Sequence, residues 1–527
     1  MDLDINWLDL PVEIWEMILC NLEIECLLNA SISCKQLNDV LSISQRLMKK
    51  ISLRIENPFK SIYFANGADI KKLFKKSIRE LNFMKKCLQK SERKYESIRI
   101  CDLEFSNLGN HEGKKKRKEI YDILKQFAGS VKQITLFNTS LQNFEFSKII
   151  QMMKNLKVLK FEGSGCVIKA KAVTEIVRPD FFSAINEIYI KDVKDFSLKN
   201  LRLFVNLTTL DIMSSSLLDF VSFTLIQINL KVLRWSNLIL FVKLTNNFKF
   251  SLDELTLNNF SWNYHESTMK FFKSQKNLKK LTLNIDCSEQ IELDELLIHL
   301  FGNNLQLKTL DLSTSGDKMG DLSYLEGIVN PSVEHLELDL DESQNATELI
   351  AAFTKLFPNV KNFHYKVRNE VNDHGLDQII KWKSLESINC YVEDINSFLE
   401  NVNSGEKLTT CIINCFYVID IRKPLMIEFL NRHQNIKHMT LNPHYGTTAP
   451  DEILSLIVNT SKSLKTLMYN GTICSLSDNS ENPLMRNLKI SNSFAGIKKF
   501  SVFRIIVNNF FRIYFYIISK IKINIGT

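Results

Sequence analysis

The chain has 527 residues, of which 45% are hydrophobic and only 16 are glycine and 9 proline, a composition typical of folded proteins and unlike that of disordered or fibrous ones. This length exceeds what one compact core usually supports, so we expect several domains or a repeat array. The 67 basic and 59 acidic residues leave a net charge of +8, a mild excess from which we expect no nucleic-acid binding.

Eleven cysteines are scattered along the chain, and none forms a C-x-x-C pair. This odd, irregular set indicates reduced thiols that pack as small hydrophobic groups. The first residues, MDLDINWLDLP, carry neither a basic flank nor a long apolar run, so we expect no signal peptide. These features predict an intracellular protein, in the cytoplasm, the nucleus or both.

The first distinctive stretch, residues 10–40, is short, helical in pattern and rich in apolar side chains. Pro11 suits the first turn of a helix, because the N–H that proline lacks would have no partner there. Apolar residues then recur at spacings of three and four, including Ile14, Ile18 and Leu22, and a second apolar group follows from Leu27. So small a unit cannot bury all these side chains internally, which predicts a partner.

The succession Leu10-Pro11-x-Glu13-Ile14, Ile18-Leu19, Leu22, Leu27-Leu28, Ala30 and Cys34-Lys35 resembles the F-box, the motif that docks onto the Skp adaptor of cullin-RING ubiquitin ligases. The resemblance implies an F-box domain at residues 5–45. The alternative is an ordinary helical cap on a larger domain. The residues expected to contribute most to adaptor binding are Leu10, Pro11, Ile14, Ile18, Leu22, Leu27 and Leu28.

Residues 46–94 are interpreted as a linker and a cap that begins the repeat array. Alternation over residues 46–56 predicts a short strand that ends at Asn57-Pro58. A basic amphipathic stretch over residues 69–90 predicts a helix.

From about residue 95 to 505 the chain repeats the phrase L-x-x-L-x-L, as in Leu278-Leu281-Leu283 and Leu307-Leu310-Leu312. Most of the 15 to 16 copies lie 22 to 29 residues apart, the spacing of leucine-rich repeats. Each phrase predicts a strand whose alternate residues point inward, and each intervening segment predicts a helix or turn on the outer side. One repeat cannot bury its own leucines, whereas a stack of repeats can.

This pattern resembles the repeats of the F-box/leucine-rich-repeat family. The implied fold is α/β: an F-box helical unit followed by a leucine-rich-repeat solenoid, with a parallel sheet on the concave face and irregular helices on the convex face. The asparagine usual at the end of each phrase is replaced, for example by Thr139, so loop carbonyls must find other donors. A hydrophobic tail follows at residues 506–527, for which a membrane span is rejected because Arg512 and neighbouring asparagines interrupt it. It is either a cap for the last repeat or a mispredicted gene end.

The candidate substrate-binding residues lie at the x positions of three successive phrases, because these positions face the concave wall. Three acids among them suggest a local acidic patch and a partner with a basic segment; the alternative is that they are simply solvated. The six residues are Asp311, His335, Glu337, Asp339, His364 and Lys366.

Two other clusters carry weaker hypotheses. His433, His438 and His444 with Cys411 and Cys415 fit no standard zinc spacing, so no metal site is expected. The basic run Lys114–Lys118 suggests a nuclear import signal or a nucleic-acid patch, or else a solvated loop before a helix at residues 119–127.

The F-box resemblance implies a substrate-recognition subunit of an SCF-type cullin-RING ubiquitin ligase, with the Skp adaptor and an unknown protein substrate as partners. Such a subunit is a non-catalytic adaptor, and the sequence carries no common catalytic motif. We expect no cofactor, no membrane partner and no obligate homo-oligomer. The alternative function is a leucine-rich-repeat protein-binding scaffold with no ubiquitin-ligase role.

Overall fold

The computed structural model divides the chain into two compact units, Met1–Leu307 and Lys308–Thr527. Leu10, Pro11, Leu28 and the tail at residues 506–527 lie outside the residues that the structure describes. The described residues are 12–20, 22, 27, 31, 34–48, 50–56, 67–90, 93–102, 111–141, 143–164, 166–168, 182–193, 195–196, 201, 204–213, 229–236, 251–260, 265–286, 293–303, 306–315, 322–340, 346–367, 375–402, 406–417, 421–445, 451–469 and 472–475.

The first unit begins with a group of helices, α1 (Val12–Cys20), α3 (Lys35–Ile43) and α4 (Gln45–Met48). Helix α1 packs against both α3 and α4. Ser44 joins them, because its hydroxyl donates to Glu16 Oε1 at 2.5 Å and accepts the backbone N–H of Leu47 at 3.1 Å. The interior of this helical group is apolar and includes Leu19, Leu27, Leu41 and Leu47, each at most 1% exposed.

The strands of the first unit pair in parallel and in chain order, from β1 to β12. Their register aligns the middle leucine of each phrase, so that Leu210, Leu233, Leu255 and Leu281 lie side by side and are fully buried. The strands are β1 (Ser52–Glu56), β2 (Ser97–Cys101), β3 (Gln133–Phe137), β5 (Val158–Glu162), β7 (Glu187–Lys191), β9 (Thr209–Met213), β10 (Val232–Trp235), β11 (Glu254–Phe260) and β12 (Lys280–Asp286).

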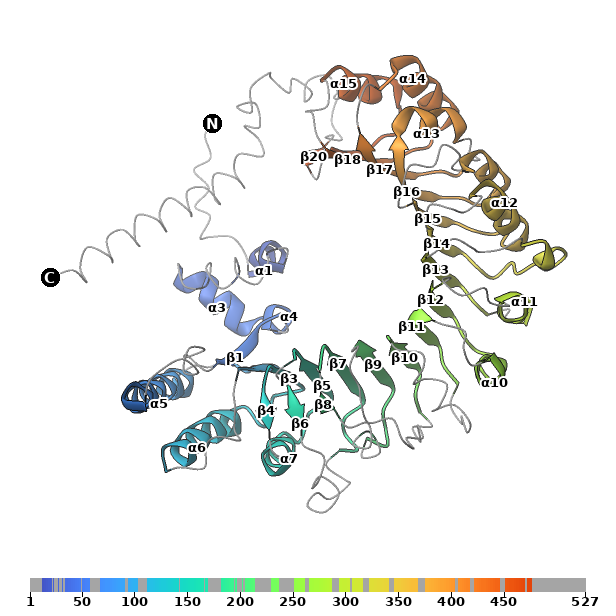
Figure 1. The fold of residues 1–527 in the computed structure, drawn as a ribbon. Coiled ribbons are helices and arrows are strands. Elements are labelled where there is room, and N and C mark those ends of the chain that lie inside the picture. Colours follow the sequence, from blue (N-terminus) through green and yellow to red (C-terminus); the bar gives the residue numbers. More distant parts are fainter. Residues whose placement is uncertain are drawn as a thin grey trace, which may run out of the picture. The chain divides into compact units, whose positions relative to one another are not determined.

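Helices connect several of these strands and lie on one side of the sheet of the first unit (Figure 1). They are α5 (Gly67–Gln89), α6 (His111–Gln126), α7 (Asn143–Met152), α10 (His265–Ser274) and α11 (Leu293–Asn303). A small parallel sheet of β4 (Ser140–Leu141), β6 (Val167–Ile168) and β8 (Asp195–Phe196) links three return segments.

Two local predictions meet different outcomes in this unit. The strand expected within residues 46–56 is confirmed as β1, and it is already part of the main sheet because it pairs with β2. The loop expected at Lys114–Lys118 is wrong, since helix α6 begins at His111 and includes the whole basic run. Lysine and arginine are good helix formers, and one of them, Lys116, is 4% exposed and helps to anchor the helix.

The second unit repeats the arrangement, with helices on one side of its own parallel sheet (Figure 1). Its helices are α12 (Ala346–Leu356), α13 (Ile395–Asn401), α14 (Lys423–Arg432) and α15 (Asp451–Thr460), with 3-10 turns at Leu322–Leu325 and Leu376–Lys381. Its strands are β13 (Thr309–Ser315), β14 (His335–Leu340), β15 (Asn362–Val367), β16 (Ser387–Asp394), β17 (Thr410–Tyr417), β18 (His438–Tyr445), β19 (Thr466–Tyr469) and β20 (Thr472–Ser475), the last antiparallel to β19.

Hydroxyl and aromatic donors replace the missing asparagine ladder at several turns. The hydroxyl of Thr139 donates to the carbonyls of Ile100 and Phe137 at 3.1 and 2.9 Å, and Ser236 donates to a carbonyl of β9 at 3.2 Å. In the second unit the indole N–H of Trp382 donates to the carbonyl of Phe357 at 2.8 Å. Different side chains therefore satisfy the loop carbonyls, which explains how the repeats vary in length and still stack.

Candidate functional site

The helical group at the start of the first unit exposes part of its apolar surface. On α1, Val12 is 49% exposed and Ile14 is 41% exposed, while Ile18, one turn after Ile14, is half-buried. Leu22 is also half-buried, and Ile43 at the end of α3 is 76% exposed. Isoleucine and valine this exposed on so small a unit offer an apolar contact surface to a partner.

The expected adaptor residues do not all lie on that surface. Ile14, Ile18 and Leu22 retain exposed area, whereas Leu27 is 0% exposed and packs inside the helical group. Leu27 therefore has no surface for a partner in this conformation and supports the fold instead. The sequence pattern did not distinguish the two kinds of position, because both are simply apolar.

Side chains from neighbouring segments fix α3 and the end of α1. The guanidinium of Arg93, just before β2, donates from Nε to Ser42 Oγ at 3.2 Å and from Nη2 to the Asn38 side chain. The ammonium of Lys50 donates to the carbonyl of Cys20. Polar contacts therefore tie α3 and the end of α1 to the segments that precede β2 and β1.

In the second unit, the open face of the sheet brings all six candidate substrate-binding residues together. The register places Asp311 beside Glu337 and Glu337 beside His364 in one row across β13, β14 and β15. Asp339 lies beside Lys366 in a second row. His335 lies in a third row, where the side chain of Asn362 forms a hydrogen bond with its ring at 2.9 Å. The rule that x positions share one face of the sheet thus places these residues as neighbours.

Two of the three acidic side chains on this face, Glu337 and Asp339, lie beside basic residues. His364 Nδ1 lies 3.0 Å from Glu337 Oε1, and Lys366 Nζ lies 3.6 Å from Asp339 Oδ2. Both basic residues also lie beside the ring of Tyr391, at 5.9 and 5.8 Å from its centroid. The ammonium of Lys366 therefore offsets the carboxylate of Asp339, and the face presents polar and charged groups around an aromatic ring.

A track of asparagine side chains continues this face and was missed by the sequence analysis. Asn414 on β17 donates to Asn389 Oδ1 on β16 at 2.8 Å and accepts from Asn442 on β18 at 3.0 Å. The signal was present, since Asn389 lies between the last two apolar residues of its phrase and Asn414 and Asn442 directly follow the last apolar residue of theirs. Amides that bridge strands in this way present polar groups suited to hydrogen bonding with an extended backbone.

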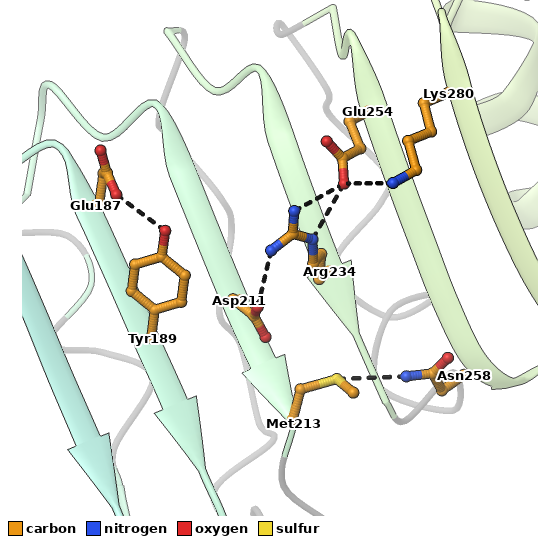
Figure 2. Close-up of polar contacts among 8 residues, drawn as sticks. All are labelled: Glu187, Tyr189, Asp211, Met213, Arg234, Glu254, Asn258 and Lys280. Carbon is orange, nitrogen blue, oxygen red and sulfur yellow. Dashed lines mark hydrogen bonds and ion pairs between the residues drawn. The ribbon is translucent and has the colours of Figure 1, made fainter. Parts of the chain in front are cut away.

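The open face of the first unit carries a second polar network, centred on Arg234 of β10 (Figure 2). Its guanidinium reaches Asp211 on β9 at 3.3 Å and Glu254 on β11 at 2.9 Å, and Lys280 on β12 lies 3.8 Å from Glu254. Alongside it, the hydroxyl of Tyr189 donates to the carboxylate of Glu187 at 2.9 Å. No residue of this network was among the predicted site residues, although all occupy positions in the repeat phrases.

Burial and ion pairing both shift the pKa values of the groups in this network. Burial raises the pKa of Asp211, and Arg234 opposes that rise. Burial, which lowers the pKa of Arg234, is outweighed by its bonds to Glu254 and Asp211, so that the pKa of Arg234 is raised. Burial together with the bond to Glu187 raises the pKa of Tyr189 to about 12. The three shifts therefore arise from burial and from the contacts within this network.

Three residues of the cluster considered for zinc, His433, Cys411 and Cys415, are buried in the packed interior. His433 is 2% exposed, with its ring 3.3 Å from the carbonyl of Val402, and burial lowers its pKa. Burial also raises the pKa of the Cys411 and Cys415 thiols. Within the described residues, His, Cys, Asp and Glu side chains form no group of three or more that could hold a metal ion.

Among the described helices, none combines the length and apolar character needed to cross a bilayer.

Solved structures with a related fold are distant in sequence. TLR13 in its complex with ssRNA13 shares 12% identity at a TM-score of 0.39, over 84% of this chain and 57% of that one, so this chain spans little more than half of its length. Internalin InlF from Listeria monocytogenes shares 15% at 0.34, over 69% and 86%. A chain of the Rad7 and Elc1 complex in yeast shares 15% at 0.32, over 81% and 96%. At these TM-scores the likenesses carry no argument about what this chain binds.

No curated protein is similar enough in sequence to count as a relative. The family model of the F-box domain matches residues 7–48, the segment that holds α1, α3 and α4. Residues 7–48 therefore form an F-box domain, which is followed by parallel strands and return helices in the rest of the first unit and in the second unit.

Proposed function

We propose that the chain is a substrate-recognition subunit of an SCF-type cullin-RING ubiquitin ligase. The F-box match at residues 7–48 carries this proposal, supported by the exposed apolar residues Val12, Ile14 and Ile43 on the same domain. In this role the F-box docks onto a Skp-type adaptor, and the repeats hold a protein substrate.

The chain acts as an adaptor in this proposal and performs no covalent step. A ligase subunit of this kind raises the effective concentration of substrate lysines near a charged ubiquitin-conjugating enzyme. That role requires a surface that binds, and the networks around Arg234 and around Tyr391 offer polar and charged side chains for it.

The open face of the second unit is the proposed substrate surface within the described residues. It combines the paired residues Glu337 and His364, the paired residues Asp339 and Lys366, and the asparagine track. Paired charges and amides favour hydrogen bonding to a polar segment of mixed charge over attraction of a purely basic one.

The adaptor step is tested by recovery of a purified Skp-type adaptor on the full chain. Ile14→Asp places a charge on the exposed side of α1 and should reduce recovery at least about tenfold, since burying an unpaired carboxylate at an apolar contact costs more than ~1.4 kcal/mol. Ile427→Asp is the matched control, because Ile427 is 37% exposed on helix α14 of the other unit.

Unchanged recovery for Ile14→Asp, or no recovery for the native chain, would contradict the adaptor role. The alternative function is then a protein-binding scaffold without a ubiquitin-ligase role. Ubiquitin transfer assayed with purified adaptor, cullin complex and conjugating enzyme separates the two, because only the ligase subunit supports transfer.

A further inference from the structure

Helices α6 and α7 of the first unit border a groove of about 830 Å³, which takes no part in the proposed adaptor docking or substrate binding. Helices α6 and α7 lie on the side of the sheet that carries the return helices (Figure 1). Its lining is strongly basic and includes Lys114, Arg117, Lys118, Lys125, Lys148 and Lys154.

The one acidic residue in this lining is already neutralised. Asp122 accepts an ion pair from Lys85 of α5 at 2.6 Å, and the same ammonium reaches Glu119 at 3.1 Å. The bond from Lys85 lowers the pKa of Asp122, so its charge is present but compensated. The groove therefore attracts anions, because its lining holds six basic side chains and one carboxylate.

Three of the basic lining residues on α6 share one face of the helix. Lys114, Lys118 and Lys125 are separated by four and seven residues, which places them on one face of the helix. At ~1.5 Å per residue they cover roughly 16 Å, about the reach of five extended residues. Lys154, just beyond α7, adds an exposed charge on the opposite border.

The floor of the groove is partly apolar, which narrows the class of ligand. Ala128 and Met152 belong to the lining and are half-buried, and the ring of Tyr121 lies under the Lys148 ammonium at 4.2 Å. A covered ring does not offer a platform on which bases could stack. Apolar floor atoms give nothing to a phosphodiester backbone but bury the aliphatic side chains of a peptide.

The predominance of lysine over arginine in the lining also favours an acidic peptide over a phosphodiester backbone. Phosphate recognition favours the arginine fork, which binds two oxygens at once, whereas lysine acts as a mobile point charge. Arg117 is the one arginine in this lining. Lysine charges on flexible stems suit carboxylates at irregular spacing.

We propose that the groove between α6 and α7 binds an acidic segment of a protein partner, rich in Asp and Glu and interrupted by apolar residues. The charge complementarity and the apolar floor carry this proposal. It does not depend on the F-box or on a ubiquitin-ligase role.

The test measures fluorescence anisotropy of a labelled peptide with the repeating sequence Asp-Glu-Leu, titrated with the full chain. Replacing Lys118, Lys125 and Lys154 together by Gln should weaken binding about tenfold, because each exposed ion pair contributes only a modest part of the affinity. The matched control replaces Lys407, Lys437 and Lys465 by Gln; these three lysines are also exposed, lie in the other unit and change the net charge equally. The control should change the affinity less than about twofold.

Three results would overturn the proposal. Equal weakening by both triple variants would show that net charge, not the groove, attracts the peptide. Equal binding of an Asn-Gln-Leu peptide would show that the carboxylates are not recognised. Binding of a single-stranded oligonucleotide of matched charge that is tighter than that of the acidic peptide, and lost in the groove variant, would assign the groove to nucleic acid instead.

Discussion

Asp211 and Arg234 are register partners on β9 and β10, and their side chains meet at 3.3 Å on the open face of the sheet. Arg234 also binds Glu254 on β11, so one guanidinium joins three consecutive strands (Figure 2). Burial raises the pKa of Asp211, and the contact with Arg234 limits that rise. The network therefore stabilises the stacking of repeats as well as shaping a binding surface.

Arg234→Ala should lower the free energy of unfolding by ~1–2 kcal/mol, because it leaves two partly buried carboxylates without their shared partner. The change is measured by urea unfolding at neutral pH. Arg54→Ala is the control, since Arg54 pairs with Glu56 while its own side chain is 58% exposed, and the expected loss is below ~1 kcal/mol. An equal loss in the two variants would contradict a structural role specific to Arg234.

Gly163 provides a test of the turns that follow the strands. It has φ +91°, and a Cβ on it would lie 2.1 Å from Asn138 Oδ1, so both the backbone and the neighbouring side chain oppose any larger residue. Gly163→Ala should lower the midpoint of urea unfolding by an amount equivalent to ~1–3 kcal/mol. Gly129→Ala is the matched control, because a Cβ there meets no atom within 4 Å, and its effect should stay within ~0.5 kcal/mol.

The strand pattern was predictable from the sequence because each phrase repeats the same burial. Leucines such as Leu255 and Leu281 must all face the helices, so the register follows from the phrase, and residues such as Glu337 and His364 fall on the opposite face. The long-range contacts were less accessible. Lys366 lies 27 residues after Asp339, and only the register shows that their charges compensate each other.

In the F-box domain, too, the sequence does not show which apolar residues are buried and which are exposed. Its apolar positions were visible as a pattern, but Leu27 and Ile14 read alike in sequence, and only packing separates the buried one from the exposed one. Likewise the basic run at Lys114–Lys118 reads as solvent-facing, whereas Lys116 turns inward on α6. Charge alone does not reveal which member of a run faces the core.

Lys116 should make stability depend on pH. Burial lowers its pKa from the ordinary 10.5 to about 8, so between these values the unfolded chain binds a proton that the folded chain has lost, and stability rises with pH. Lys116→Met should therefore be more stable than the native chain at pH 7, by a gap that narrows by ~2 kcal/mol toward pH ~9.5. The measurement is the urea midpoint at both pH values. Lys115→Met, at an exposed neighbouring position, should show no pH-dependent gap; a similar gap there would contradict the assignment.

Leu27 and Ile43 separate support of the F-box fold from contact with a partner. Leu27→Ala removes a fully buried side chain and should cost ~2–4 kcal/mol within the helical group, seen as faster hydrogen exchange over residues 12–48. Ile43→Ala, at a position 76% exposed, should leave that exchange unchanged.

Adaptor affinity then distinguishes the two roles. Ile43→Ala should weaken Skp-type adaptor binding without loosening the domain, if the exposed end of α3 is part of the contact. Leu27→Ala should weaken binding only in proportion to the fraction of unfolded domain, because the binding-competent state is depleted rather than altered. Equal exchange in Leu27→Ala and the native chain, together with a large loss of adaptor binding, would show that Leu27 contacts the adaptor directly after the domain opens.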